Sequence, residues 1–244
     1  MSTQPIHFDK APIVEAIVGI DFEETLPIEV LETLKVLGET LKPDYPTVEN
    51  LTFGEYKIQV GSPVSQIETQ IGYFFKSADG LQVVHAKRNG FGFSRLKPYQ
   101  SWGEFIAEAK RTWGIYRSVL GAASLAKFSV RYINKLTWPS DGKIEDYLAV
   151  YPHIPEGLPQ LLSGCFVRLD YPLSEPQEGK LTQQIASVPE SQQEFVSFVL
   201  DNEFTFAALG LQDREVWQRI EQCQDLKNVV FLSSITEKMK GLIS

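Results

Sequence analysis

Apolar and polar positions in the first fifty residues predict a strand followed by a helix. Residues 12–23 are dense in β-branched side chains, which favour a strand. After Pro27, leucines recur every three or four residues until Pro43, which ends the expected helix. The chain therefore opens with a β–α pair.

Four shorter alternating runs follow and predict an antiparallel meander. These runs cover residues 51–60, 67–76, 81–87 and 91–96. Asp79-Gly80 and Asn89-Gly90 separate the last three runs, and both dipeptides favour tight hairpin turns. Consecutive hairpins join strands that lie side by side and antiparallel.

The clearest helix covers residues 102–120. Ser101 followed by Glu104 forms a capping-box signature at its start. One stripe of this helix is apolar: Trp102, Phe105, Ile106, Ala109, Trp113, Tyr116 and Leu120. A strand is expected next over residues 127–138, with Tyr132, Asn134 and Trp138 on one face and Arg131 and Lys135 on the other.

The second half of the chain repeats the order of strands first and helix afterwards. A proline-rich connection at residues 143–163, with a short helix around Tyr147 and Leu148, precedes it. Strands are expected at residues 165–173, 181–187, 194–200 and 203–209. A helix at residues 214–227 follows, and Ser234 and Glu237 predict the start of a last short helix.

These elements predict an α+β fold in which an antiparallel sheet carries helices on one face. The order of elements suggests two similar strand-then-helix halves. We place the first at residues 1–142 and the second at residues 164–244, with residues 143–163 as the connection.

The composition is that of a folded protein, with 43% hydrophobic and 11% aromatic residues. No run approaches the roughly 18 apolar residues of a membrane span, and residues 1–10 lack a secretion signal. Two cysteines make neither a disulfide framework nor a zinc site, and three histidines lack metal-ligand spacing. We therefore expect a cytoplasmic protein without membrane contacts, metal or cofactor.

Charge is distributed unevenly along the chain. The net charge is −8, yet residues 76–135 hold eleven Lys/Arg against three Asp/Glu, a balance of +8. Residues 1–75 and 136–244 are each acidic, with a balance of −8. The basic segment predicts either an anion-binding face or neutralisation by the acidic flanks, within the fold or across a homodimer.

Six residues of the basic segment are candidates for binding an anion or a nucleic acid. They are Arg88, Arg95, Lys97, Tyr99, Arg131 and Lys135. Tyr99 and Trp102 would add stacking surfaces for a base. The alternative interpretation is structural: Arg95 pairs with an acidic neighbour and Trp102 belongs to the core.

A second group predicts a pocket between sheet and helix. Its candidates are Trp102, Tyr132, Asn134 and Trp138. An asparagine on an apolar strand face must be hydrogen-bonded, either to a ligand or to a neighbouring loop. His85 has no evident catalytic partner in the sequence, and we assign no catalytic residue.

Three stretches carry a resemblance. They are Ala11-Pro12-Ile13-Val14-Glu15-Ala16, Ser94-Arg95-Leu96-Lys97-Pro98-Tyr99-x-x-Trp102-x-x-Phe105, and Val130-Arg131-Tyr132-Ile133-Asn134. Together they resemble a sporadically distributed prokaryotic family of proteins of roughly 250 residues, without an assigned function. The resemblance is strongest over residues 91–139. It implies a prokaryotic protein, and the patchy distribution suits mobile elements or antiviral defence by association.

Three functions from different classes fit the sequence. The first, which the sequence favours, is a non-enzymatic interaction or adaptor protein that acts with itself or another protein. The second is binding of nucleic acid, nucleotide or another phosphate-bearing ligand through residues 76–135. The third is a ligand-binding or enzymatic pocket lined by Tyr132, Asn134 and Trp138.

Overall fold

Nine strands and four helices make up the described part of the chain. The computed structural model describes all residues except 1–7, 9, 58–64, 160–163, 175–176 and 193. The strands are β1 (Ile13–Phe22), β2 (Thr47–Lys57), β3 (Ser65–Lys76), β4 (Gln82–Lys87), β5 (Gly90–Leu96), β6 (Leu125–Pro139), β7 (Phe166–Leu173), β8 (Gly179–Val188) and β9 (Phe195–Ala207). The helices are α1 (Val30–Leu41), α2 (Trp102–Leu120), α3 (Asp213–Ser234) and α4 (Glu237–Ile243), with a 3₁₀ turn at Ile144–Asp146.

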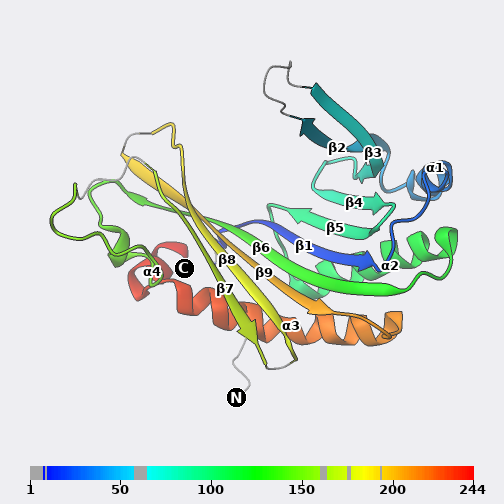
Figure 1. Cartoon of the computed structure of the whole chain (residues 1–244). Helices are drawn as coiled ribbons and strands as arrows, with labels where there is room; N and C mark the ends of the chain where they lie inside the picture. The colour runs from blue at the N-terminus through cyan, green and yellow to red at the C-terminus, as the bar shows by residue number, and fades with distance from the viewer. Residues whose placement is uncertain (1–7, 9, 58–64, 160–163, 175–176, 193) are drawn as a thin grey trace.

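The strands form one twisted sheet in the order β2-β3-β4-β5-β1-β6-β9-β8-β7 (Figure 1). Every neighbouring pair is antiparallel. The predicted α+β class with an antiparallel sheet is therefore confirmed. The expected meander is β2 to β5, and β1 is inserted between β5 and β6.

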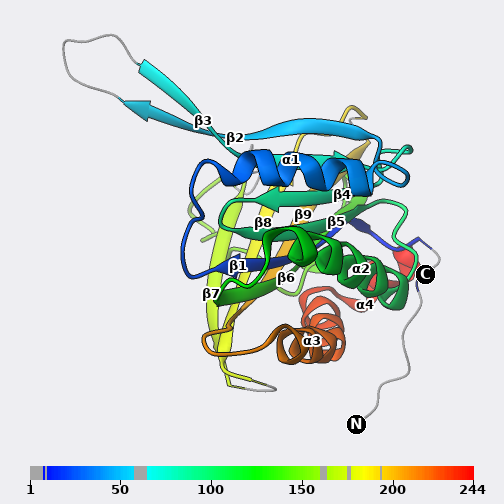
Figure 2. The ribbon, with the colours of Figure 1, turned by 90° about the vertical axis from the view of Figure 1, so that its right-hand side faces the viewer.

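The first three helices cover the same face of this sheet. Helix α1 packs against β3, α2 against β5, and α3 against β6 and β9. Figure 2 shows α1, α2 and α3 side by side over that face. We call it the helix face and the other one the open face.

Local sequence signals explain where α2 begins and how β6 is oriented. The Ser101 hydroxyl accepts a hydrogen bond from the Glu104 N–H at 3.2 Å, which caps the helix as the sequence predicts. Gly121, at a φ of 75°, ends it. From Phe128 to Trp138 of β6, even-numbered side chains are buried under the helices, whereas odd-numbered ones lie on the open face.

The pairing of β6 with β9 joins the two halves expected from the sequence. The ladder runs over thirteen residue pairs, from Lys127–Ala207 to Pro139–Phe195. Strands from residues 1–142 and from residues 164–244 thus belong to one sheet. A site on the helix face near β6 and β9 is built by both segments.

Buried side chains form two clusters on the helix face. The larger lies under α1, α2 and α3 and includes Phe91, Trp113, Tyr116 and Phe204. The smaller lies near α4 and includes Trp138, Tyr147, Phe198 and Met239. Polar residues of β6 and β9 lie between the two clusters along these strands, and they become the floor of the pocket described below.

Several expected element boundaries differ from the structure, among them three in the second half of the chain. The separate strands expected at 194–200 and 203–209 are one strand, β9, because the intervening polar residues are hydrogen-bonded within the sheet. Helix α3 continues to Ser234, since its last apolar residues pack on the same side as the earlier ones. The last helix is capped by Thr236, whose hydroxyl accepts from the Met239 N–H.

Candidate ligand pocket

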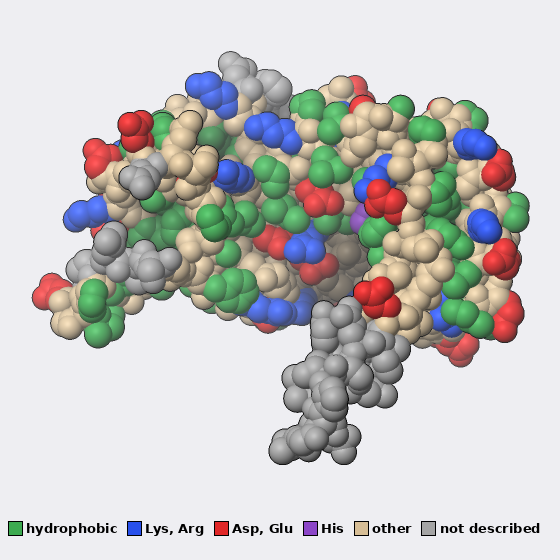
Figure 3. All heavy atoms as spheres, turned by 90° about the horizontal axis from the view of Figure 1, so that it is seen from above, with side chains coloured by type: hydrophobic (Ala, Val, Ile, Leu, Met, Phe, Trp, Pro, Cys, Tyr) green, Lys and Arg blue, Asp and Glu red, His purple; other side chains and the backbone are tan. Residues whose placement is uncertain are grey.

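The basic segment 76–135 is largely neutralised by carboxylates from outside it. Eight of its eleven Lys and Arg side chains form such ion pairs. They are Lys76–Glu49, Lys87–Asp21, Lys110–Glu221, Arg111–Asp44, Arg117–Asp213, Lys127–Asp21, Arg131–Asp201 and Lys135–Glu190. On the face shown in Figure 3, basic and acidic side chains are interspersed, without a large area of one sign. The segregated charges of the sequence therefore form ion pairs with one another inside the fold.

The structure does not bring the predicted basic residues together. Ala16 pairs with Arg95 on one side and with Tyr132 on the other, so these three side chains share the helix face. Arg131 and Lys135 are odd-numbered residues of β6 and lie on the open face. Successive side chains of a strand point to opposite faces, so Arg131 points away from the face that Tyr132 and Arg95 share. Arg95 and Arg131 therefore lie on opposite sides of the sheet.

The two basic residues on the open face are held by carboxylates. Arg131 donates from Nε to Asp201 at 2.8 Å, and this bond, together with the nearby Glu203, raises the pKa of Arg131. Lys135 donates to Glu190 at 2.9 Å and lowers the pKa of that carboxyl to about 2. Both positions are occupied by ion pairs of the fold.

The remaining three basic residues of the segment have different environments. Arg95 is buried and donates from Nη2 to the Pro98 carbonyl at 3.2 Å. Arg88 donates from Nε to the Leu26 carbonyl at 2.9 Å and so anchors the segment after β1. Lys97 is exposed and lines a pocket.

This pocket has a volume of about 760 Å³ and lies between the sheet, the start of α2 and the second half of α3. Residues 97–103 form one wall and residues 224–232 of α3 form another, while β6 and β9 form the floor and residues near the start of β1 contribute the rest. Five predicted residues line it: Lys97, Tyr99, Trp102, Tyr132 and Asn134.

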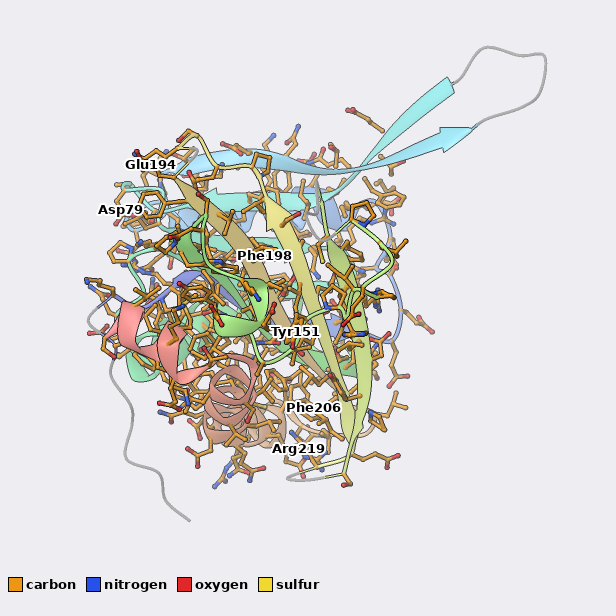
Figure 4. The ribbon with its side chains drawn as sticks, turned by 90° about the vertical axis from the view of Figure 1, so that its left-hand side faces the viewer. Asp79, Tyr151, Glu194, Phe198, Phe206 and Arg219 are labelled. Carbon is orange, nitrogen blue, oxygen red and sulfur yellow. The ribbon has the colours of Figure 1, made fainter. Side chains whose placement is uncertain are left out.

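Trp138 belongs to the smaller core cluster and not to this pocket. Its ring stacks on Tyr147 at 5.0 Å and on Phe198 at 5.1 Å between centroids. Figure 4 labels Phe198 and Phe206 at two separate points along β9, and Trp138 stacks on Phe198. Trp138 shares a face of β6 with Asn134, as the two-residue period predicts. Leu136 lies between them on that face, so Trp138 is too far along the strand to line the pocket.

The floor of the pocket is a row of polar residues on the helix face. Asn202 of β9 is the register partner of Tyr132 on one side and of Gln183 on the other. Asn134 lies two residues further along β6 on the same face. The side chains of Asn134 and Asn202 are both only 2% exposed. Buried amides of this kind are costly unless each polar atom has a partner.

Aromatic side chains enclose this floor. The hydroxyls of Tyr99 and Tyr132 are 3.0 Å apart, and the rings of Trp102 and Tyr132 stack at 6.4 Å. Burial raises the pKa of Tyr99 to about 12, and it raises the pKa of Tyr132 as well. Both phenols are therefore neutral near pH 7. A flat ring can pack against these surfaces.

Lys227 of α3 points its ammonium group into this aromatic environment. Its Nζ lies 4.8 Å from the ring centroid of Tyr132 and 5.7 Å from that of Trp102. It donates to the Asn228 side-chain oxygen at 2.7 Å. Burial lowers the pKa of Lys227 to about 8, and the negative charge of Asp225 opposes that shift in part.

Positive charge dominates the pocket. Lys10, Lys97 and Lys227 line it, and within the described part of the chain no Asp or Glu does. The pocket also receives the start of α2, where the N–H groups of Trp102 and Gly103 precede the first intrahelical bonds. A helix N-terminus carries partial positive charge, so an anionic group is favoured here.

A serine–histidine pair that the sequence does not reveal lies on the open face. Ser94 Oγ and His85 Nε2, on neighbouring strands, are 3.1 Å apart. Burial lowers the pKa of His85 to about 4, so the ring is neutral. The Ser94 side chain is only 1% exposed and cannot reach a substrate. This pair therefore supports the sheet.

The sequence reasoning missed Asn202, Gln183, Ser234 and Lys227. For Lys227 a signal exists: Val216, Ile220, Cys223, Lys227 and Ser234 recur at helical spacing along the buried stripe of α3. A lysine on an apolar stripe is a candidate functional residue. The asparagine and glutamine carry no such signal, because only the strand register brings them together.

Comparison with known proteins adds no assignment. No protein-family model matches the chain, and no curated protein matches it closely enough to count as a relative. The resemblance drawn from the three sequence stretches therefore remains an expectation. In the described part of the chain, no helix has both the length and the apolar character required to cross a membrane.

Proposed function

We propose that this protein binds a small ligand that combines an anionic group with a flat ring. The observation that carries the proposal is the ammonium group of Lys227. It is half-buried, lines the pocket and forms no ion pair with a carboxylate of the described residues. Partial withdrawal of a charge from water is costly without a counter-charge, and a bound anion would supply that counter-charge.

The shape and lining of the pocket support the same conclusion. Its volume of about 760 Å³ is in the range of pockets for small molecules, roughly 300–1,000 Å³. Tyr99, Trp102 and Tyr132 provide surfaces for a ring, and Lys97 and the α2 N-terminus provide further positive charge. Most basic side chains of segment 76–135 are held in ion pairs, which favours the pocket over a wider basic surface as the place where an anion binds. The interaction-protein function stays a prediction.

The test uses 1-naphthyl phosphate, which joins a flat ring to a phosphate. We expect it to raise the melting temperature of the protein in a saturable manner, and more than inorganic phosphate or 1-naphthol does. Lys227→Met should abolish this effect. Lys238→Met is the matched control, because Lys238 lies 4.6 Å over the Tyr147 ring outside the pocket. No shift, or an equal shift in both variants, would contradict the proposal.

A further inference from the structure

Two amide groups on the pocket floor each present one unused polar atom. Asn134 donates from Nδ2 to the Leu200 carbonyl at 3.3 Å, and its Oδ1 has no hydrogen-bond partner among the described residues. Asn202 accepts at Oδ1 from Gln183, and its Nδ2 likewise has no partner there. Both side chains are more than nine-tenths buried and line the pocket.

Backbone carbonyls fix which atom each amide turns toward the pocket. A carbonyl can only accept, so Ser234 donates its hydroxyl proton to the Val230 carbonyl at 2.7 Å. The Ser234 oxygen then accepts from Gln183 Nε2 at 2.8 Å. The same nitrogen donates to Asn202 Oδ1 at 2.9 Å, which leaves Asn202 Nδ2 as the free donor.

The same reasoning makes Asn134 a free acceptor, because the Leu200 carbonyl takes its amide N–H. Asn134 and Asn202 are diagonal neighbours on adjacent strands, since Tyr132 is the register partner of Asn202. The floor thus offers one acceptor beside one donor. A ligand that satisfies both must carry a donor beside an acceptor on one edge.

We infer that the ligand is a nucleoside monophosphate, a conclusion that rests on the proposed function of the pocket. The edge of its base donates to Asn134 Oδ1 and accepts from Asn202 Nδ2, and its ring packs against the aromatic walls. Lys227, Lys97 and the N–H groups at the start of α2 bind the phosphate. Nucleobases provide adjacent donors and acceptors, whereas most aromatic acids do not.

The pocket favours a mononucleotide over a nucleic acid strand. A volume of about 760 Å³ suits one nucleotide, and the basic residues that a strand would follow are paired inside the fold. An oligonucleotide is therefore an alternative outcome of the test and not part of the proposal.

The experiment measures calorimetric affinities of the full chain for the 5′-monophosphates of uridine, cytidine, adenosine and guanosine. Ribose 5-phosphate, which lacks the base, and 1-naphthyl phosphate, which lacks the polar edge, are the reference compounds. At least one mononucleotide should bind about tenfold or more tightly than either reference, since bidentate base contacts discriminate at that level. Lys227→Met should weaken every phosphate ligand.

Asn202→Asp tests the base edge separately from folding. The aspartate keeps an oxygen for Gln183 but replaces the free donor by an acceptor. The floor then presents two acceptors, so the ligand must supply two adjacent donors, and guanine offers these at N1 and N2. The affinity ratio of guanosine to uridine monophosphate should rise about tenfold or more. Asn89→Asp, at an exposed turn, should leave that ratio unchanged.

The outcomes separate the two claims. If 1-naphthyl phosphate binds as tightly as every mononucleotide and Asn202→Asp leaves the base preference unchanged, the nucleotide inference is overturned while the proposed function holds. If an eight-residue oligonucleotide binds and mononucleotides do not, the inference is overturned in favour of a strand. If no phosphate ligand binds, both claims fail.

Discussion

The Nζ atom of Lys227 lies 4.8 Å from the ring centroid of Tyr132, in a pocket that no carboxylate of the described residues lines. One residue comes from a helix near the end of the chain and the other from a strand in its middle. Their contact shows that both segments build the same site. It also makes the charge of Lys227 the most informative property to measure.

Lys227→Met should stabilise the unliganded protein at pH 7, by an amount on the order of 3 kcal/mol. The estimate follows from a pKa of about 8 in the folded state against 10.5 for an ordinary lysine. Below pH 8 the folded wild type bears the full cost of burying the charge. Between pH 8 and 10.5 it loses the proton while the unfolded chain keeps it, so its stability rises and the advantage of the variant shrinks.

Urea unfolding of both proteins from pH 7 to 10 measures this difference. Tyr99 and Tyr132 remain protonated over most of this range because burial raises their pKa values. A constant difference in free energy of unfolding across the pH range would show that Lys227 is not the buried charge described here.

The Arg131–Asp201 pair should contribute more to stability than an exposed pair of the same residue types. Asp201 is only 6% exposed, and its partner donates two hydrogen bonds to it. A double-mutant cycle to alanine should give a coupling energy of about 1–3 kcal/mol. The exposed Arg168–Asp170 pair is the matched control and should give a clearly smaller coupling, because water screens it. Equal couplings would contradict this account.

Ser234→Ala should destabilise the protein by about 1–3 kcal/mol, because it leaves the buried amide of Gln183 without one acceptor. It should also weaken mononucleotide binding, since the orientation of Asn202 is no longer fixed. Ser118→Ala removes a similar hydroxyl bond to a helix carbonyl at an exposed position, and should change stability by less than about 0.5 kcal/mol. Similar losses in the two variants would argue against the network.

Trp138 and Trp102 should respond differently to truncation, although the sequence groups them together. Trp138→Ala should cost about 3–5 kcal/mol of stability, since it removes a ring stacked on Tyr147 and Phe198. Trp102→Ala should cost less stability but lower the affinity for ring-bearing ligands. Urea unfolding and calorimetry distinguish them. Loss of affinity with Trp138→Ala in the folded protein would contradict the assignment.

The helices and strands could be predicted because their signals are local. The capping box at Ser101 and the two hairpin dipeptides depend on neighbouring residues, and the structure has α2 and β5 where they indicate. The sequence wrongly predicts two strands where the structure has the single strand β9. The reason is that Asp201 and Asn202 resemble a turn in sequence. Partners from distant segments keep those residues in the strand.

The candidate site could be predicted only in part, for a related reason. Alternation along β6 separates Tyr132 and Asn134 from Arg131, and the sequence shows that much. The order of strands in the sheet does not follow from alternation. It decides that Asn202 lies beside Tyr132 and that Arg131 meets Asp201. Lys227 reaches the site only because α3 crosses β6 and β9.

The most direct measurement is the number of protons taken up when uridine 5′-monophosphate binds at pH 8.5. Calorimetry in two buffers of different ionisation enthalpy gives this number, and the phosphate, with a second pKa of about 6, is already fully ionised. An anion beside Lys227 raises its pKa from about 8, so the wild type should take up a substantial fraction of one proton. Lys227→Met should take up none. Binding without proton uptake, or equal uptake in the variant, would contradict the account.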